Sequence, residues 1–331
     1  MSALDTSPQG KVLALCGGVG GAKLALGLDR VLPAGALTIA TNTGDDFEHL
    51  GFHISPDLDT VMYTLAGLNN QETGWGRAGE SWNFMQALAA LGGEAWFQLG
   101  DKDLATHVER TRRLRQGESL SQITRDLAVR LGIKSRLLPM SDDPVRTMIR
   151  TADGMLPFQH YFVRLRCEPA ALGFAFDGAE EARPNSEMMA AFAAPDLALV
   201  VICPSNPYLS VDPILAVPGV RAALHRCAAP VVAVSPLVSG QAVKGPTAKI
   251  MRELNIAVSA TSVAKHYGGL VDGFVIDSTD AHLRDEIQEM GIAVHTAQTV
   301  MRSSTDRAAL AGECLGFAQR ILAERPEIAG R

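Results

Sequence analysis

Short aliphatic runs recur along this chain, and they restrict its fold more than any other feature of the sequence. Each run is rich in Val, Leu, Ile and Ala and is bounded by Gly, Pro, Ser or Asp. The runs are Val12–Cys16, Leu37–Ala40, Leu197–Cys203, Val231–Ser235, Gly273–Asp277 and Ile292–His295. Parallel strands have this composition because helices cover both of their faces and leave no face for polar side chains. The runs therefore predict buried parallel strands.

Amphipathic stretches with helical spacing lie between or after these runs. They are Ala22–Val31, Val217–Arg226, Pro246–Leu254, Asp280–Met290 and Thr305–Ala323. Strands that alternate with helices are typical of α/β proteins with a parallel sheet. The sequence therefore predicts a doubly wound α/β fold with a mostly parallel, Rossmann-like sheet.

The middle of the chain has a different pattern. Helical stretches follow one another at Trp82–Leu91, Asp103–Arg115 and Ser119–Leu131, and short strands are predicted at Lys134–Leu138, Val145–Arg150 and Phe158–Leu165. Residues 63–185 are therefore expected to form a helix-rich inserted subdomain with short strands. The nucleotide-binding α/β core is then formed by residues 11–62 and 186–325.

Two local signals support this interpretation of the middle segment. Ser119 and Gln122 have the spacing of a helix capping box. Asp153-Gly154 is a common hairpin signal, so a tight turn is expected there.

Composition argues against several classes of function. The 331 residues carry a net charge of -6, and the densest basic segment, Arg110–Arg115, is expected to be a solvated helix face rather than a nucleic-acid site. No apolar run reaches the roughly 18 residues of a membrane span, and Met1–Gly10 is unlike a secretory signal. The five cysteines have no metal-type spacing, which favours reduced, buried thiols. We therefore expect a cytoplasmic protein without nucleic-acid or membrane partners.

A glycine-rich turn, Gly17–Lys23, follows the first predicted strand. Glycines let a main chain approach a phosphate closely, and a helix N-terminus favours negative charge. The turn does not fit a dinucleotide fingerprint, because Lys23 stands where a third glycine belongs. It does not fit a Walker A loop either, because Ala22 and Leu24 occupy the positions of Gly and Ser or Thr. Phosphate binding is expected; a tight turn that only packs helix against sheet is the alternative.

Two acidic turns follow, at Asn42–Asp46 and Ser55–Thr60. The first comes just after a predicted strand, where open α/β sheets bind ligands. Carboxylates with waters and substrate phosphates are the usual ligands of Mg²⁺. Helix capping by Asp57 or Asp59 is the alternative, but it accounts for one aspartate and not for four. The turns predict a metal or substrate site.

Further loops end other predicted strands. Cys203–Ser210 contains two prolines, and its Asn206 has a donor and an acceptor suited to a base edge. Ser235-Pro236 ends another strand, and Lys244 opens a later helix where it could meet a phosphate. The turns at Leu99–His107 and Met140–Val145 are as compatible with capping and turn formation as with function.

This ordered set of motifs resembles the 2-phospho-L-lactate transferase family of coenzyme F-420 biosynthesis. The resemblance covers nearly the whole chain. It rests on Gly17–Lys23, Asn42–Asp46, Ser55–Thr60, Leu99–His107, Pro139–Pro144, Pro204–Pro207, Ser235–Pro236 and Lys244–Pro246. It implies a Mg²⁺-dependent transfer of a phospho-three-carbon acid from a guanosine diphospho-donor to the terminal hydroxyl of the deazaflavin Fo, with release of GMP. The family also suggests a homodimer.

The resemblance assigns roles to individual residues. The implied nucleotide-binding residues are Gly17, Gly18, Gly20, Gly21, Lys23, Thr41, Asn42, Ser205, Asn206, Pro207, Ser235, Lys244 and Gly245. Asp45, Asp57, Asp59 and Lys102 are expected to contact Fo or the diphosphate. Asp46 and Asp59 are the expected metal ligands and catalytic residues. Asp59 is either a second ligand or the group that orients the hydroxyl, and a role as base requires a suitably shifted pKa. Trp75, Trp82 and Phe84 could offer a flat surface to the deazaflavin ring.

Other functions remain open at this point. A related gluconeogenesis-factor family shares the glycine turn and acidic loops and binds nucleotide sugars, so a non-catalytic regulator is the alternative. A nicotinamide-dependent dehydrogenase is a third hypothesis, against which Lys23 argues. The acid on the donor is not identified: phospholactate, phosphoenolpyruvate and phosphoglycerate all fit.

Overall fold

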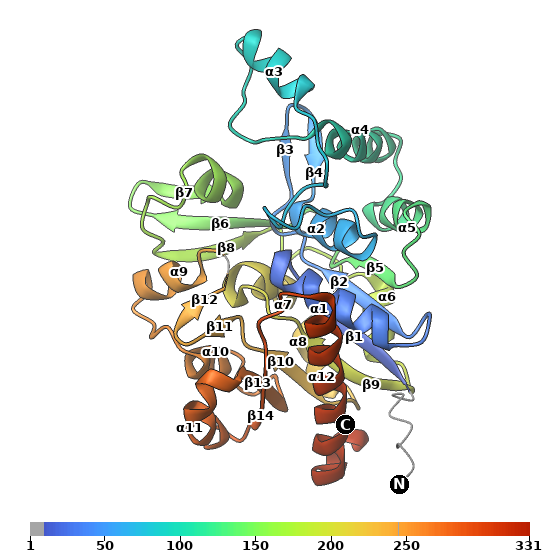
Figure 1. The fold of residues 1–331 in the computed structure, drawn as a ribbon, viewed down its shortest axis with the longest axis vertical. Coiled ribbons are helices and arrows are strands. Elements are labelled where there is room, and N and C mark those ends of the chain that lie inside the picture. Colours follow the sequence, from blue (N-terminus) through green and yellow to red (C-terminus); the bar gives the residue numbers. More distant parts are fainter. Residues whose placement is uncertain (1–9, 244) are drawn as a thin grey trace.

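A seven-stranded sheet, parallel throughout, runs through the centre of the chain (Figure 1). In spatial order its strands are β14 (Ala293–Ala297), β13 (Gly273–Asp277), β10 (Val231–Val234), β9 (Leu197–Ile202), β1 (Lys11–Cys16), β2 (Leu37–Thr41) and β5 (Arg136–Pro139). The computed structural model describes residues 10–243 and 245–331, so Lys244 of the predicted nucleotide loop lies outside the described residues. The predicted α/β fold with a parallel sheet is confirmed.

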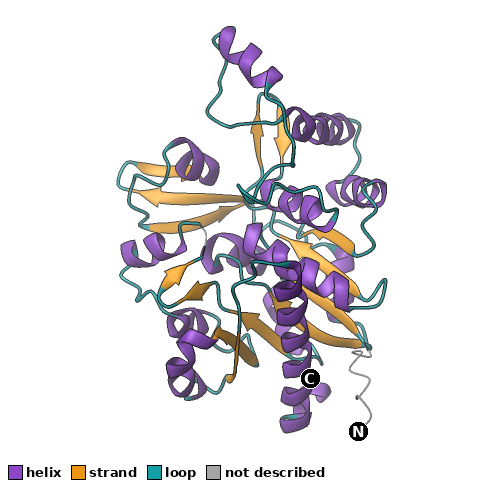
Figure 2. Cartoon of the chain, viewed as in Figure 1, coloured by secondary structure: helices purple, strands orange, loops and turns teal. Residues whose placement is uncertain are grey.

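Successive side chains of β1 point to opposite faces of the sheet, and both faces are covered, which is why the strand is apolar throughout. Val12, Ala14 and Cys16 pack with helices α1 (Gly18–Val31), α2 (Pro56–Leu65) and α12 (Ser304–Glu324). Leu13 and Leu15 belong to the core on the other face of the sheet. That second face is covered by α6 (Ser186–Phe192), α7 (Asp212–Ala216), α8 (Val220–Arg226), α9 (Thr247–Glu253), α10 (Ala260–His266) and α11 (Arg284–Gln288). Helices on both faces of the sheet make the fold doubly wound (Figure 2).

The strand order changes direction between β1 and β9. From β1 the chain passes to β2 on one side, and β9 starts the half that continues through β10 and β13 on the other. Ligands of open α/β sheets bind outside the carboxyl ends of strands at such a switch point. The glycine turn that follows β1 and the loop that follows β9 both lie there.

The predicted insertion is helical in its first part. It contains α3 (Asn83–Ala90), α4 (Asp101–Arg115) and α5 (Leu120–Arg130), and the predicted capping box of Ser119 and Gln122 begins α5. Hairpin β3 (Phe47–His49) and β4 (Phe52–Ile54) lies with α3 at the end of the molecule remote from both labelled termini (Figure 1). Strand β5 pairs with β2 in the main sheet, although the predicted insertion includes it. The division into core and insertion stays a prediction.

A separate antiparallel sheet follows β5. Its order is β7 (Gly154–Pro157), β6 (Arg146–Thr151) and β8 (Gly173–Asp177), and the predicted Asp153-Gly154 turn joins β6 to β7. The strand predicted at Phe158–Leu165 is wrong, because His160–Arg164 is a π-helix. Aromatic and β-branched residues favour strands locally, but the buried pair Phe158 and Tyr161 needs the one-turn spacing of a helix to reach the core.

The remaining elements are short. They are a π-helix at Pro207–Val211, hairpin β11 (Leu237–Val238) and β12 (Gln241–Ala242), and 3-10 helices at Ser278–Leu283 and Pro326–Gly330. All five cysteines are buried and unpaired, as expected. Within residues 10–243 and 245–331, no helix combines the length and the apolar character needed to cross a membrane.

Candidate active site

One large cavity opens at the carboxyl ends of the central strands. Its volume is about 560 Å³, within the range of small-molecule and cofactor sites. It brings together many of the residues singled out from the sequence. Those that line it are Gly17, Gly18, Gly20, Lys23, Asp45, Asp57, Asp59, Trp75, Ser205, Asn206, Ser235 and Gly245. Those that do not are Gly21, Thr41, Asn42, Asp46, Trp82, Phe84, Lys102 and Pro207.

The backbone of the glycine turn packs directly against the backbone of the loop that follows β9. A Cβ at Gly20 would lie 2.2 Å from the carbonyl oxygen of Pro204, so only glycine fits this approach. The Gly17 amide donates to Ser205 Oγ over 3.1 Å, and Ser205 Oγ donates back to the Gly17 carbonyl over 3.1 Å. No side chain caps the N-terminus of α1. Asp57 accepts from the Gly18 amide, so the later amides of the first turn of α1 are the ones that can bind an anion.

Asp57 supports this turn from the protein side. Its Oδ2 accepts from Asn42 Nδ2 over 3.0 Å, and the Gly18 amide and Ser210 hydroxyl also donate to its carboxylate. Burial raises the pKa of Asp57 to about 6, against the opposing effect of these hydrogen bonds. Asn42 also donates to the Leu209 carbonyl over 3.3 Å. Both side chains thus hold the turn and its neighbours together, and their predicted contacts with substrate stay predictions.

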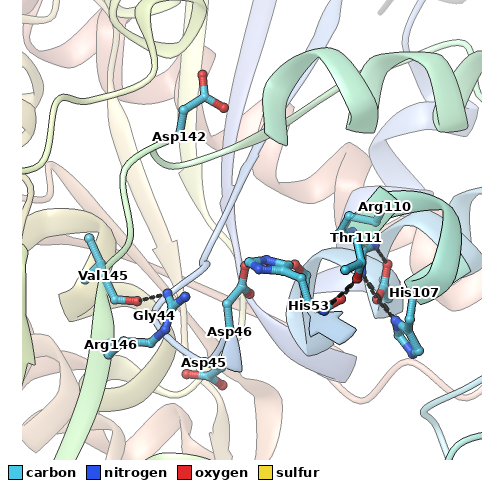
Figure 3. A network of polar contacts seen from close by, with 12 residues as sticks. Gly44, Asp45, Asp46, His53, His107, Arg110, Thr111, Asp142, Val145 and Arg146 are labelled. Atoms are coloured by element: carbon cyan, nitrogen blue, oxygen red, sulfur yellow. Dashed lines mark hydrogen bonds and ion pairs between the residues drawn. The ribbon is translucent and has the colours of Figure 1, made fainter. Parts of the chain in front are cut away.

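The first acidic turn holds two buried carboxylates in different environments. Asp46 Oδ2 accepts from Ser55 Oγ over 2.7 Å and lies 3.0 Å from His53 Nε2 (Figure 3). Its other oxygen, Oδ1, is buried and has no partner. Asp45 Oδ1 is also buried without a partner, and burial together with the nearby Asp57 charge raises the pKa of Asp45 well above its ordinary value. Two unpartnered carboxylate oxygens from adjacent residues fit a hard cation.

Asp59 is held by the guanidinium of Arg110, which was predicted to face solvent. Arg110 is only 1% exposed, and both of its terminal nitrogens donate to the Asp59 carboxylate, Nη1 over 3.0 Å. The predicted solvated face at Arg110–Arg115 is therefore wrong for Arg110. It is wrong for Arg113 as well, which is buried and whose Nη2 donates to Asp126 over 2.6 Å. Burial raises the pKa of Asp59, while the Arg110 and His107 charges act in the opposite direction.

One face of α4 carries the rest of this buried network (Figure 3). His107 Nδ1 lies 3.7 Å from Asp59 Oδ2, and His107 Nε2 lies 3.3 Å from Asp103 Oδ2. Tyr63 donates to Asp103 over 2.7 Å. The signal was present in the sequence, because residues 103, 107 and 110 recur at helical spacing on one face. Asp59, Asp103 and His107 each offer a ligand atom within 4.8 Å of the others, but a cation there would share Asp59 with Arg110.

The two predicted lysines differ in position. Lys23 lines the cavity, and its ammonium donates to the Met301 carbonyl over 3.2 Å. Lys102 donates to the Gly79 carbonyl over 2.6 Å and does not line the cavity. A contact between Lys102 and a bound diphosphate would require its ammonium to leave Gly79, and this role stays a prediction.

Aromatic side chains form another wall of the cavity. Trp75 was expected there, but Trp96, Phe97, Phe158 and Phe162 were not singled out from the sequence. The rings of Phe158 and Phe162 are stacked 5.3 Å apart at 11°. Of the other aromatic candidates, Phe84 packs instead on the small core of Ile54, Met85 and Leu99, and Trp82 is exposed. An apolar, aromatic wall suits a flat heterocycle.

Comparisons with known proteins identify the family to which this chain belongs. A family model described as 2-phospho-L-lactate transferase CofD matches residues 12–309. Curated relatives named phosphoenolpyruvate transferase include one from Streptomyces griseus, 40% identical over 95% of this chain and 100% of the relative. Another, from Mycobacterium tuberculosis, is 37% identical over 88% of this chain and 93% of the relative.

Among solved structures, a UPF0052 family protein from Bacillus halodurans superposes with a TM-score of 0.60. It is 14% identical and covers 93% of this chain and 99% of its own, so it supports the fold alone. The family match and the curated relatives, by contrast, extend over nearly the whole chain. The chain is therefore a member of the 2-phospho-L-lactate transferase CofD family.

Proposed function

We propose that this protein transfers a phospho-three-carbon acid from a guanosine diphospho-donor to the terminal hydroxyl of Fo, releasing GMP, as a step of coenzyme F-420 biosynthesis in the cytoplasm. One observation carries the proposal: a single cavity joins the glycine turn, four aspartates and an aromatic wall. Phosphoenolpyruvate is the first candidate for the transferred group, because relatives 36–41% identical are named for it.

The nucleotide end of the cavity is the turn between β1 and α1, together with the loop after β9. Asn206 Oδ1 accepts from the amides of Tyr208 and Leu209, over 3.0 and 3.2 Å. Its Nδ2 is buried and has no partner, so this side chain offers a donor only. Guanine presents two acceptors, O6 and N7, on one edge. Asn206 therefore suits guanine better than adenine, whose corresponding edge carries an amino donor.

The reaction needs positioning more than covalent chemistry by the protein. The Fo hydroxyl attacks the phosphorus that carries the three-carbon acid, a new P–O bond forms, and the P–O bond to GMP breaks. Asp59 lines the cavity, and Arg110 fixes its orientation through two hydrogen bonds. The hydroxyl proton passes to the Asp59 carboxylate, whose raised pKa suits a proton acceptor.

The acidic turn fits the Mg²⁺ that the proposal includes. The unpartnered oxygens of Asp45 and Asp46 would hold it, whereas Asp59 would first have to release Arg110. Bound Mg²⁺ would offset negative charge on the diphosphate. Lys23, which lines the same cavity, adds a positive charge beside the glycine turn.

The experiment mixes purified protein, Fo, Mg²⁺ and each of the donors that carry phosphoenolpyruvate, phospholactate or phosphoglycerate. Mass spectrometry should detect the coenzyme precursor and GMP in equal amounts. Absence of GMP with all donors would count against the transferase. Binding of Fo is monitored by its intrinsic fluorescence. A protein that binds the nucleotide but not Fo would instead be a regulator of the gluconeogenesis-factor type. The homodimer is part of the same proposal and is tested by light scattering.

A further inference from the structure

A second, smaller cavity adjoins the large one and is positively charged. Its volume is about 60 Å³, and it shares Val19 and Lys23 with the main cavity. Arg302 and Arg307 line it as well, but no carboxylate of the described residues does. The volume corresponds to roughly two water molecules, enough for a carboxylate or phosphate group and too small for a nucleotide.

Arg307 is the unusual member of this cavity. Its side chain is 8% exposed, its Nε is buried without a partner, and no carboxylate of residues 10–243 or 245–331 forms an ion pair with it. Burial, with the nearby charge of Arg30, lowers its pKa. A buried charge without a counter-ion is costly, so it is normally paired. The charge of the adjacent Asp306 opposes this effect without forming an ion pair with Arg307, so the buried Nε is left for an anion from outside the described chain.

The position of Arg307 is set by packing of main chain on main chain. Helix α1 crosses α12 so closely that a Cβ at Gly27 would lie 2.1 Å from the Arg307 carbonyl oxygen. The backbone of Arg307 is thus fixed against the third turn of α1, and its side chain lines the same cavity as Val19 from the first turn. Thr64, Asn69 and Gln71 line the same cavity and add neutral groups that can donate hydrogen bonds.

We propose that Lys23, Arg302 and Arg307 form an anion subsite that binds a carboxylate or phosphate group beside the main cavity. During the proposed reaction the subsite binds the carboxylate of the donor's three-carbon acid. This identification of the ligand rests on the proposed function. Arg307 is the principal contact, because a guanidinium binds carboxylate and phosphate through paired hydrogen bonds.

Inorganic phosphate tests the subsite without any substrate. Its binding is measured by calorimetry at constant ionic strength for the wild type, Arg307→Met and the control Arg30→Met. Arg30→Met removes one positive charge, as Arg307→Met does. Arg30 lies near Arg307 but does not line the cavity, so it serves as the matched control. Arg307→Met should weaken phosphate binding about tenfold or more, as expected for a charge-assisted contact. The control should change phosphate binding by less than about threefold, because Arg30 does not line the cavity and solvent screens its charge.

Two results would overturn the subsite: no phosphate binding by the wild type, or equal binding by the wild type and Arg307→Met. If the Met variant does not fold, Arg307→Lys replaces it, and it should bind phosphate more weakly because the paired donors are lost. Donor kinetics then test the ligand. Arg307→Met should raise KM for the donor and leave KM for Fo unchanged. Phosphate binding by a wild type without transfer activity would retain the subsite and refute the proposed function.

Discussion

Replacement of Arg110 by Met should destabilise the fold strongly, because it leaves a buried carboxylate without its counter-charge. Asp59 is 5% exposed and Arg110 is 1% exposed, so neither group has water to compensate for a lost partner. Removing one member of a buried ion pair typically costs about 3–5 kcal/mol. We expect a loss of this size in the free energy of unfolding, measured by urea denaturation at pH 7.

A matched control lies on the same helix. Arg112 pairs with Glu109 over 2.8 Å, but both side chains are about half exposed. Exposed pairs contribute roughly 0–1 kcal/mol, so Arg112→Met should change stability little. A loss for Arg110→Met no larger than for this control would refute the reasoning.

The destabilisation should also depend on pH. Without Arg110, the pKa of Asp59 rises further above its ordinary value, because the His107 charge alone is left to oppose burial. A carboxyl with a raised folded-state pKa stabilises the fold below its unfolded pKa and loses that contribution as pH rises. The stability difference between Arg110→Met and the wild type should therefore shrink as the pH falls. The double variant Arg110→Met/Asp59→Asn, which has no buried charge at either site, should recover much of the loss at pH 7.

Other predictions concern the turns. Asp46→Asn should keep the fold and lose most transfer activity, which steady-state rates with Fo and donor would show; near-normal rates would remove the metal assignment. Asp59→Asn should lose activity and also stability, because Arg110 loses its counter-charge. Gly20→Val would place its Cβ against the Pro204 carbonyl oxygen, so we expect a lower melting temperature together with weaker GDP binding. Asp143 accepts hydrogen bonds from the Arg183 amide and guanidinium, which lower its pKa to about 2. The wild type should thus be more stable than Asp143→Asn above about pH 4, and this difference in the free energy of unfolding should vanish toward pH 2. A difference that does not change across that range would contradict the lowered pKa of Asp143.

Local sequence pattern was sufficient for most of the sheet and for the glycine turn that lines the cavity. Each aliphatic run is short and bounded by turn residues, so β1 and the glycine turn after it could be placed without tertiary information. Strand β5 could not be assigned to the main sheet, because its pairing with β2 crosses about a hundred residues of chain. Pairing over such distances leaves no signature in a local window.

The rest of the site was missed for a physical reason. Arg110 is followed in sequence by the solvent-facing Arg112 and Arg115, and only the tertiary approach of Asp59 reveals that Arg110 is buried. The aromatic wall brings Trp96 and Phe97 from a loop to Phe158 and Phe162 of the helical segment that contains the π-helix His160–Arg164. These side chains are ordinary core candidates in isolation, and their role depends on which empty space they face.

The support beneath the glycine turn has a thermodynamic consequence. Gly17 and Gly18 already use their amides on Ser205 and Asp57, so this part of the chain has its final conformation before any nucleotide arrives. A preorganised loop loses little conformational entropy on association. Nucleotide association should therefore leave hydrogen–deuterium exchange at these amides almost unchanged, whereas a loop that folds around its ligand would become strongly protected.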